Sequence, residues 1–128
     1  MSNGMKTPLG RVRGLGSAKS GTEHFWRQRI TGVAMVPLTI FFVLVVIYLA
    51  KASQATAIAT LSRPLVAILM FLFVIAGIIH MRIGMQVIIE DYVHDEKWKI
   101  AAVMANTFFS LLVGACCTYA LLKLNFGI

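Results

Sequence analysis

Three apolar segments, each long enough to cross a lipid bilayer as a helix, dominate this sequence. They cover about 30–50, 65–89 and 100–122. A bilayer core about 30 Å thick needs about 20 helical residues, and each segment reaches that length. The segments lack the period-two alternation of membrane strands, and a barrel would need many more of them. The sequence therefore predicts an all-α membrane protein with three transmembrane helices.

The composition excludes most other classes of protein. Apolar residues make up 59% of the chain and charged residues 13%, whereas soluble domains average about 45–50% and about 25%. A domain of this size buries only about two-thirds of its surface, so a core cannot absorb the excess. Disorder, a fibrous repeat and a disulfide scaffold are excluded by the same figures. Cys116 and Cys117 are adjacent in an apolar run and are expected to be simple packing residues.

The chain divides into a polar arm and an apolar anchor. Residues 1–28 are interpreted as a basic cytoplasmic arm, and residues 29–128 as a three-helix transmembrane domain. The first apolar run begins too late for a signal peptide and has no clear processing site after it. A mitochondrial presequence stays open, because the arm contains Arg and Ser and little acid. We favour a bacterial inner membrane over a mitochondrial one.

Lysine and arginine residues near the segment ends predict the orientation. The arm and its junction carry six basic residues, and Lys97 and Lys99 join them, so roughly eight lie on one side against three on the other. The N-terminus is therefore expected in the cytoplasm and the C-terminus in the periplasm. The net charge of +7 is largely a topology signal, and no nucleic-acid partner is expected. The six basic residues of the arm and its junction are Lys6, Arg11, Arg13, Lys19, Arg27 and Arg29, and the three on the opposite side are Lys51, Arg63 and Lys123.

Two local signals concern the helices themselves. Ser62, followed by Arg63 and Pro64, predicts a capped start for the second helix. Pro37 lies inside the first segment, where it can kink the helix without preventing it.

The second segment holds the ionisable residues. His80 and Arg82 lie within it, and an ionisable residue in a membrane span is costly unless it is paired or used. Gly84 lies about 40° from His80 on the helix, where a missing side chain would let a flat macrocycle approach. A neutral imidazole is a good axial ligand for haem iron. Two interpretations stay open: His80 ligates haem, or it hydrogen-bonds a neighbouring helix.

The other candidate residues lie toward the inner helix ends. Tyr92 could donate a hydrogen bond to a membrane-soluble quinone, and Asp91 could orient that phenol or relay a proton. The alternatives are an interfacial tyrosine and a solvated acid. Arg29 could pair with an anionic haem edge, or it could be a positive-inside anchor. Arg82 projects roughly opposite His80 and is expected to extend its charge to the interface.

The remaining histidines, His24 and His94, lie at or beyond the helix ends. A haem with two histidine ligands would therefore need the second one from another chain.

These residues resemble the hydrophobic membrane anchor subunits of succinate dehydrogenase, of the alphaproteobacterial type. The span count, orientation and length agree with that family, so the resemblance covers nearly the whole chain. It rests on His80, Gly84 and Asp91-Tyr92, and on His24-Phe25-Trp26 with Arg29 and Thr31.

The resemblance implies a subunit of the tricarboxylic acid cycle and respiratory chain. It would share one haem b with a cytochrome b subunit and dock an iron–sulfur subunit and a flavoprotein. Ubiquinone would be the substrate at the membrane. FAD and the iron–sulfur clusters would lie on the other subunits, so no residue here would be catalytic for succinate oxidation.

The resemblance also implies residue roles. His80 matches the axial ligand of the haem iron, with Gly84 beside it, and Arg29 matches a position near the haem propionates. Tyr92 matches the tyrosine of the quinone site, and Asp91 its acidic neighbour.

Two other functions stay open. One is a small proton or ion transporter that uses His80, Arg82 and Asp91, although the first and third segments are uncharged. The other is a haem-free scaffold subunit whose arm docks a soluble protein.

Overall fold

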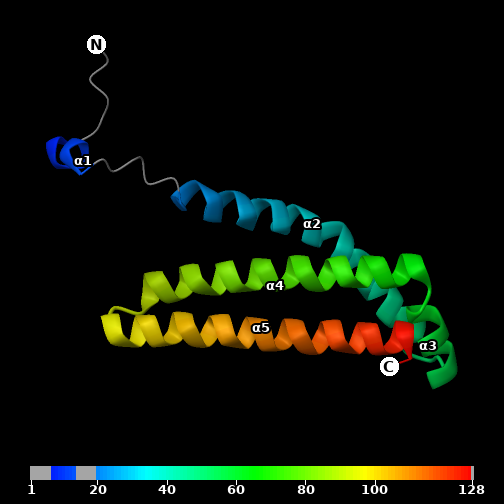
Figure 1. Ribbon diagram of the computed structural model, residues 1–128. Coiled ribbons are helices and arrows are strands. Elements are labelled where there is room, and N and C mark those ends of the chain that lie inside the picture. The colour runs from blue at the N-terminus through cyan, green and yellow to red at the C-terminus, as the bar shows by residue number, and fades with distance from the viewer. Residues whose placement is uncertain (1–6, 14–19, 128) are drawn as a thin grey trace, which may run out of the picture.

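The described part of the chain is entirely helical. The computed structural model describes residues 7–13 and 20–127, in which five helices and no strand occur (Figure 1). Lys6 and Lys19 of the predicted arm lie outside these residues. The helices are α1 (Pro8–Val12), α2 (Ser20–Leu49), α3 (Gln54–Leu61), α4 (Pro64–Tyr92) and α5 (Glu96–Phe126).

Three of these helices can cross a membrane. Thr22–Leu49, Pro64–Tyr92 and Glu96–Phe126 are each long and apolar enough for a span. The prediction of an all-α protein with three transmembrane helices is thereby confirmed.

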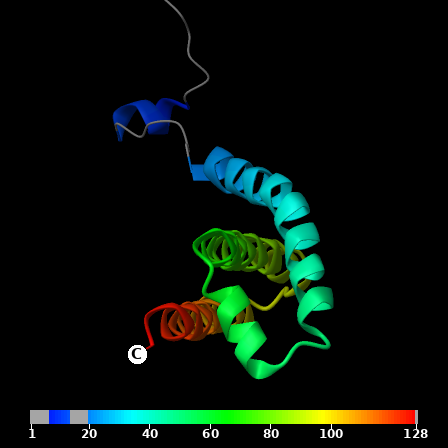
Figure 2. The same cartoon turned by 90° about the vertical axis from the view of Figure 1, so that its right-hand side faces the viewer.

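Helix α4 is the central element of the bundle. It packs against α2 and against α5, and it runs antiparallel to α5 (Figure 1). The start of α2, the end of α4 and the start of α5 lie toward one end of the bundle, and α3 lies toward the other (Figures 1 and 2).

Small residues let α4 and α5 pack closely. A Cβ atom on Gly114 would lie 2.9 Å from Ile78 Cδ1, and Ser110 is only 1% exposed. Asn106 Nδ2 donates a hydrogen bond of 2.9 Å to the Arg82 carbonyl oxygen across the same interface. Small side chains and interhelical hydrogen bonds are the usual means by which membrane helices associate.

Helices α2 and α4 contact each other at several points along their length. Met35 packs against Gly77, and the rings of Phe42 and Phe73 stack with centroids 4.6 Å apart. Helix α2 curves over the bundle in Figure 2 and contains Pro37, whose missing N–H weakens the helix and favours bending.

The helix ends show where local prediction holds. Helix α4 begins at Pro64 as expected, but its cap residue is Arg63, which makes no side-chain cap bond. The expected capping role of Ser62 is wrong, because its hydroxyl donates to the Leu124 carbonyl oxygen at 2.8 Å. Ser62 instead joins the α3–α4 corner to the end of α5.

Two elements extend the sequence-based picture. Helix α3 occupies the expected loop between the first two spans, and Ser53 caps it by accepting from Thr56 N at 3.2 Å. Helix α5 begins at Glu96, four residues before the apolar segment, because Asp95 Oδ1 accepts from Trp98 N at 3.0 Å.

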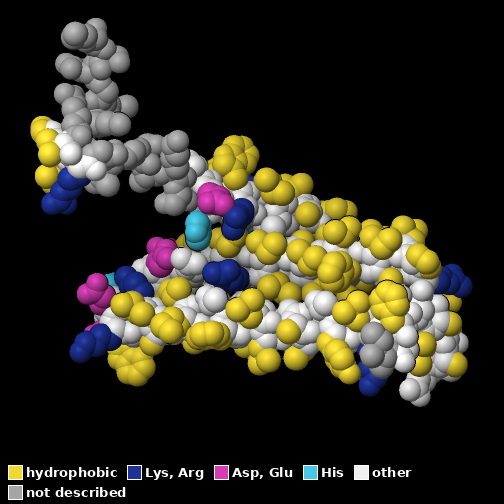
Figure 3. Space-filling view, viewed as in Figure 1, with side chains coloured by type: hydrophobic (Ala, Val, Ile, Leu, Met, Phe, Trp, Pro, Cys, Tyr) yellow, Lys and Arg dark blue, Asp and Glu magenta, His cyan; other side chains and the backbone are white. Residues whose placement is uncertain are grey.

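The outer surface of the bundle is apolar over most of its length. Large hydrophobic side chains are exposed on α2, α4 and α5. Acidic residues and most of the visible basic residues gather toward the end of the bundle where α4 ends and α5 begins (Figure 3). Such a surface fits lipid and neighbouring membrane helices.

Candidate functional site

His80 lies on α4, partly buried against α2. Its Nδ1 atom lies 3.2 Å from Thr31 Oγ1. The same hydroxyl lies 2.7 Å from the Arg27 carbonyl oxygen and 3.2 Å from that of Gln28. A hydroxyl has one proton, and the contact with the Arg27 carbonyl oxygen is the shorter one, so we assign the proton to that bond. With this assignment Thr31 Oγ1 is the acceptor, and His80 Nδ1–H is the donor.

The second ring nitrogen of His80 is the chemically available one. With the proton on Nδ1, Nε2 carries a lone pair. No residue in the described ranges hydrogen-bonds Nε2. The two interpretations of His80 are thus compatible, since one nitrogen contacts the neighbouring helix and the other is left to bind a ligand.

Gly32 lets the backbone of α2 approach the imidazole. A Cβ atom at this position would lie 3.3 Å from His80 Cε1 and 3.7 Å from Nδ1. Thr31 and Gly32 together hold one edge of the ring. The sequence alone does not pair them with His80, because only the register between α2 and α4 brings these residues together.

Gly84 lies one turn from His80 and faces the side chain of Gln28 on α2. A Cβ atom on Gly84 would lie 3.2 Å from Gln28 Nε2. Gln28 Oε1 is buried and has no hydrogen-bond partner among the described residues. In this chain the missing side chain of Gly84 accommodates a polar residue of the neighbouring helix.

Arg29 lies on α2 and is exposed. Its guanidinium carbon lies 4.4 Å from the centroid of the Phe25 ring, a cation–π contact. Gly32 forms part of an open groove of about 600 Å³ here and also touches the His80 ring. One lining residue, Gly32, therefore lies between the groove and His80. The groove is lined by Trp26, Arg29, Ile30, Gly32 and Val33.

Asp91 and Tyr92 end α4 and are both exposed, Tyr92 to 76%. At about 1.5 Å per residue, Asp91 lies about 16 Å along the helix from His80. The structure therefore places the two predicted sites on one helix but at different depths.

Arg82 is exposed on α4, and its side chain forms no ion pair with another described residue. His80, Arg82 and Asp91 do not converge on one point of the bundle, which gives a transporter pathway no support.

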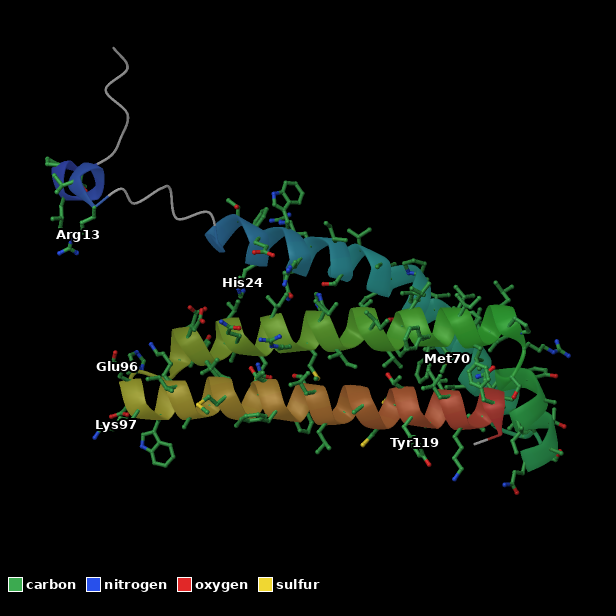
Figure 4. All side chains as sticks on the ribbon, in the orientation of Figure 1. Arg13, His24, Met70, Glu96, Lys97 and Tyr119 are labelled. Carbon is green, nitrogen blue, oxygen red and sulfur yellow. The ribbon has the colours of Figure 1, made fainter. Side chains whose placement is uncertain are left out.

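The other two histidines occupy exposed positions. His24 extends from α2 toward α4 (Figure 4), and His94 lies between α4 and α5. Within residues 7–13 and 20–127, no group of three or more His, Cys, Asp or Glu side chains is placed to hold a metal ion.

Comparison with known proteins places this arrangement in a family. The model of the succinate dehydrogenase/fumarate reductase transmembrane subunit matches residues 3–114. The chain belongs to this family. The similarity extends to its hydrophobic membrane anchor subunits, which include alphaproteobacterial members. No solved structure gives a significant match.

Three relatives illustrate the similarity. The hydrophobic membrane anchor subunit of succinate dehydrogenase from Paracoccus denitrificans is 36% identical over 121 residues, which cover 94% of this chain and 93% of the relative. The corresponding subunit from Rickettsia bellii is 30% identical and covers 88% of this chain and 90% of its own length. The membrane anchor subunit from Reclinomonas americana is 38% identical over a region that covers 66% of this chain and 73% of the relative.

Membership and fold together establish the general role. The chain is a membrane anchor subunit of succinate dehydrogenase, an oxidoreductase complex, and it associates with other subunits of that complex. Its three apolar helices and its bacterial relatives make it a multi-pass protein of the bacterial inner membrane.

Proposed function

We propose that this anchor subunit shares one haem b with a cytochrome b subunit and contributes to the ubiquinone-reduction site. It takes no part in succinate oxidation itself. The flavoprotein and the iron–sulfur subunit, which carry FAD and the iron–sulfur clusters, dock at its inner end. The observation that carries the proposal is the state of His80, whose Nδ1 contacts Thr31 while Nε2 has no partner in the described chain.

The hydrogen bond at Nδ1 of His80 is the kind expected of a histidine that would hold haem iron through Nε2. Ligating histidines usually donate their other ring N–H to a fixed acceptor, and Thr31 Oγ1 has that place here. Haem supplies a reversible one-electron centre when it is bound. The partner subunit provides the second histidine, because His24 is exposed near the start of α2 and His94 is exposed between α4 and α5.

Arg29 and Gly84 complete the haem-binding set on this chain. Arg29 lines the groove that approaches His80, so its guanidinium can pair with an anionic carboxylate edge there. Phe25 supports the guanidinium through the cation–π contact. Gly84 belongs to this set as the residue one turn from the ligand, and its Cβ position lies 3.2 Å from Gln28 Nε2 of the neighbouring helix.

The quinone site uses the end of α4. The Tyr92 hydroxyl donates a hydrogen bond to a quinone carbonyl oxygen at the membrane surface. Asp91 is exposed beside it and can pass protons from the aqueous phase. The subunits that deliver electrons dock on the same side, where the charged residues gather in Figure 3.

A reduced-minus-oxidised spectrum of the purified complex tests the haem assignment. We expect a b-type band in the wild-type complex and its loss in His80→Leu. His24→Leu is the matched control and should retain the band, because His24 is an exposed histidine near the start of α2. A complex without a b-type band, or a His80→Leu complex that keeps it, contradicts the proposal.

A further inference from the structure

We infer that Thr31 is a positioning residue for the haem ligand: its hydroxyl accepts the Nδ1 proton of His80 and so determines how Nε2 binds iron. This inference rests on the proposed haem ligation by His80. It adds Thr31, which lies on a different helix from His80, and it concerns the reduction potential of the haem as well as the presence of the haem.

The first step is the orientation of the Thr31 hydroxyl. Thr31 Oγ1 lies 2.7 Å from the Arg27 carbonyl oxygen, one turn earlier on α2. This bond uses the only hydroxyl proton and leaves the oxygen lone pairs to face the contact of 3.2 Å with His80 Nδ1. A hydroxyl that already donates is also a somewhat better acceptor, because hydrogen bonds in a chain polarise one another.

The second step is the lack of another acceptor for the Nδ1 proton. In the described residues only Thr31 hydrogen-bonds the His80 ring. Gly32 packs against the same edge of the ring, with its Cβ position 3.3 Å from Cε1. Moving the proton to Nε2 would require the Thr31 hydroxyl to turn from the Arg27 carbonyl oxygen to Nδ1, and turning the ring would give up the bond to Thr31, in a region where an unpaired polar group is costly.

The third step is the effect on the iron. An acceptor on Nδ1–H increases the basicity of the imidazole. A more basic ligand favours ferric over ferrous iron, so the bond to Thr31 lowers the reduction potential and helps to retain the group.

Two substitutions at Thr31 separate the hydroxyl from the shape of the side chain. Thr31→Val keeps the branched shape and removes the acceptor, whereas Thr31→Ser keeps the acceptor. Thr107→Val is the matched control, because Thr107 makes the same bond to its own helix, at 3.0 Å to the Val103 carbonyl oxygen, on α5. The complexes are compared by redox titration, by electron paramagnetic resonance and by haem content per complex.

We expect Thr31→Val to weaken haem retention by about 10–100-fold. A tenfold loss of preference for ferric iron would raise the midpoint potential by about 59 mV, the value for a one-electron couple. Thr31→Ser and Thr107→Val should keep the wild-type potential and resonance spectrum. If Thr31→Val loses the haem entirely, retention with the wild-type potential in Thr31→Ser still supports the inference.

Two results overturn it. One is a wild-type potential and spectrum in the Thr31→Val complex. That result would mean that ligation by His80 does not depend on Thr31. The other is an equal change in Thr31→Ser and Thr31→Val, which assigns the effect to packing. Failure of haem ligation itself is recognised separately, by a b-type band that survives His80→Leu.

Discussion

At the residue scale, the Tyr92 hydroxyl is a hydrogen-bond donor at the end of a membrane helix, and the residue is 76% exposed. We expect Tyr92→Phe to lower ubiquinone reduction by about tenfold, because a hydrogen bond contributes about 0.5–1.5 kcal/mol and about 1.4 kcal/mol corresponds to tenfold. Succinate oxidation with an artificial soluble acceptor should not change, since that reaction bypasses the membrane. Steady-state assays with the two acceptors provide the measurement.

Tyr119→Phe is the control for this substitution. Tyr119 is also an exposed tyrosine, at 60%, but it lies on α5 toward the opposite end of the bundle (Figure 4). It should leave both activities unchanged. Equal loss of both activities in Tyr92→Phe would argue for a structural role of the phenol.

The difference between His80 and Thr31 shows which single residues a sequence can reveal. His80 is identifiable because an ionisable side chain inside an apolar segment needs a reason. Thr31 is one of the residues that carry the family resemblance, but threonine is ordinary in a membrane helix, so the sequence gives no sign that it contacts His80. Its importance depends on the 3.2 Å contact with His80, which follows from how α2 crosses α4.

At the element scale, Ser110 of α5 is the most buried side chain in the described residues, at 1% exposed. We expect Ser110→Leu to destabilise the pairing of these helices by about 1–3 kcal/mol, because the larger side chain has no space. Ser110→Ala should have little effect, since it removes only the bond of 2.7 Å to the Asn106 carbonyl oxygen in the same helix. Thermal unfolding of the complex in detergent measures both, and equal stability of the two variants would contradict this packing.

The helix ends explain why some elements follow from local sequence and others do not. Pro64 begins α4 as predicted, because proline suits the first turn of a helix wherever the helix lies. The hydroxyl of Ser62 bonds to the end of α5 instead, so a tertiary contact overrides the local capping preference. Helix α3 is too short to show a clear apolar period, and its capping by Ser53 is recognised only in the structure.

At the scale of the whole molecule, segment length and hydropathy suffice to predict three spans, because the bilayer thickness sets the length of each helix. They do not predict which helices touch. The central place of α4 depends on close contacts such as Gly32 with His80 and Gly114 with Ile78, and small residues are common throughout these helices. The groove beside Arg29 likewise becomes visible only after α2 has been placed.

The orientation of the bundle is the prediction that belongs to this scale. The excess of basic residues near the start of α2 and the start of α5 should keep that end of the protein in the cytoplasm. With Cys116 and Cys117 replaced by Ala, a cysteine at Lys51 should react with a membrane-impermeant thiol reagent in intact spheroplasts. A cysteine at Lys97 should react only after permeabilisation, because it lies at the opposite end of the spans. Both positions are exposed, so burial cannot mask the labelling. The reverse pattern would place Tyr92 on the periplasmic side, where it could not receive electrons from subunits docked in the cytoplasm.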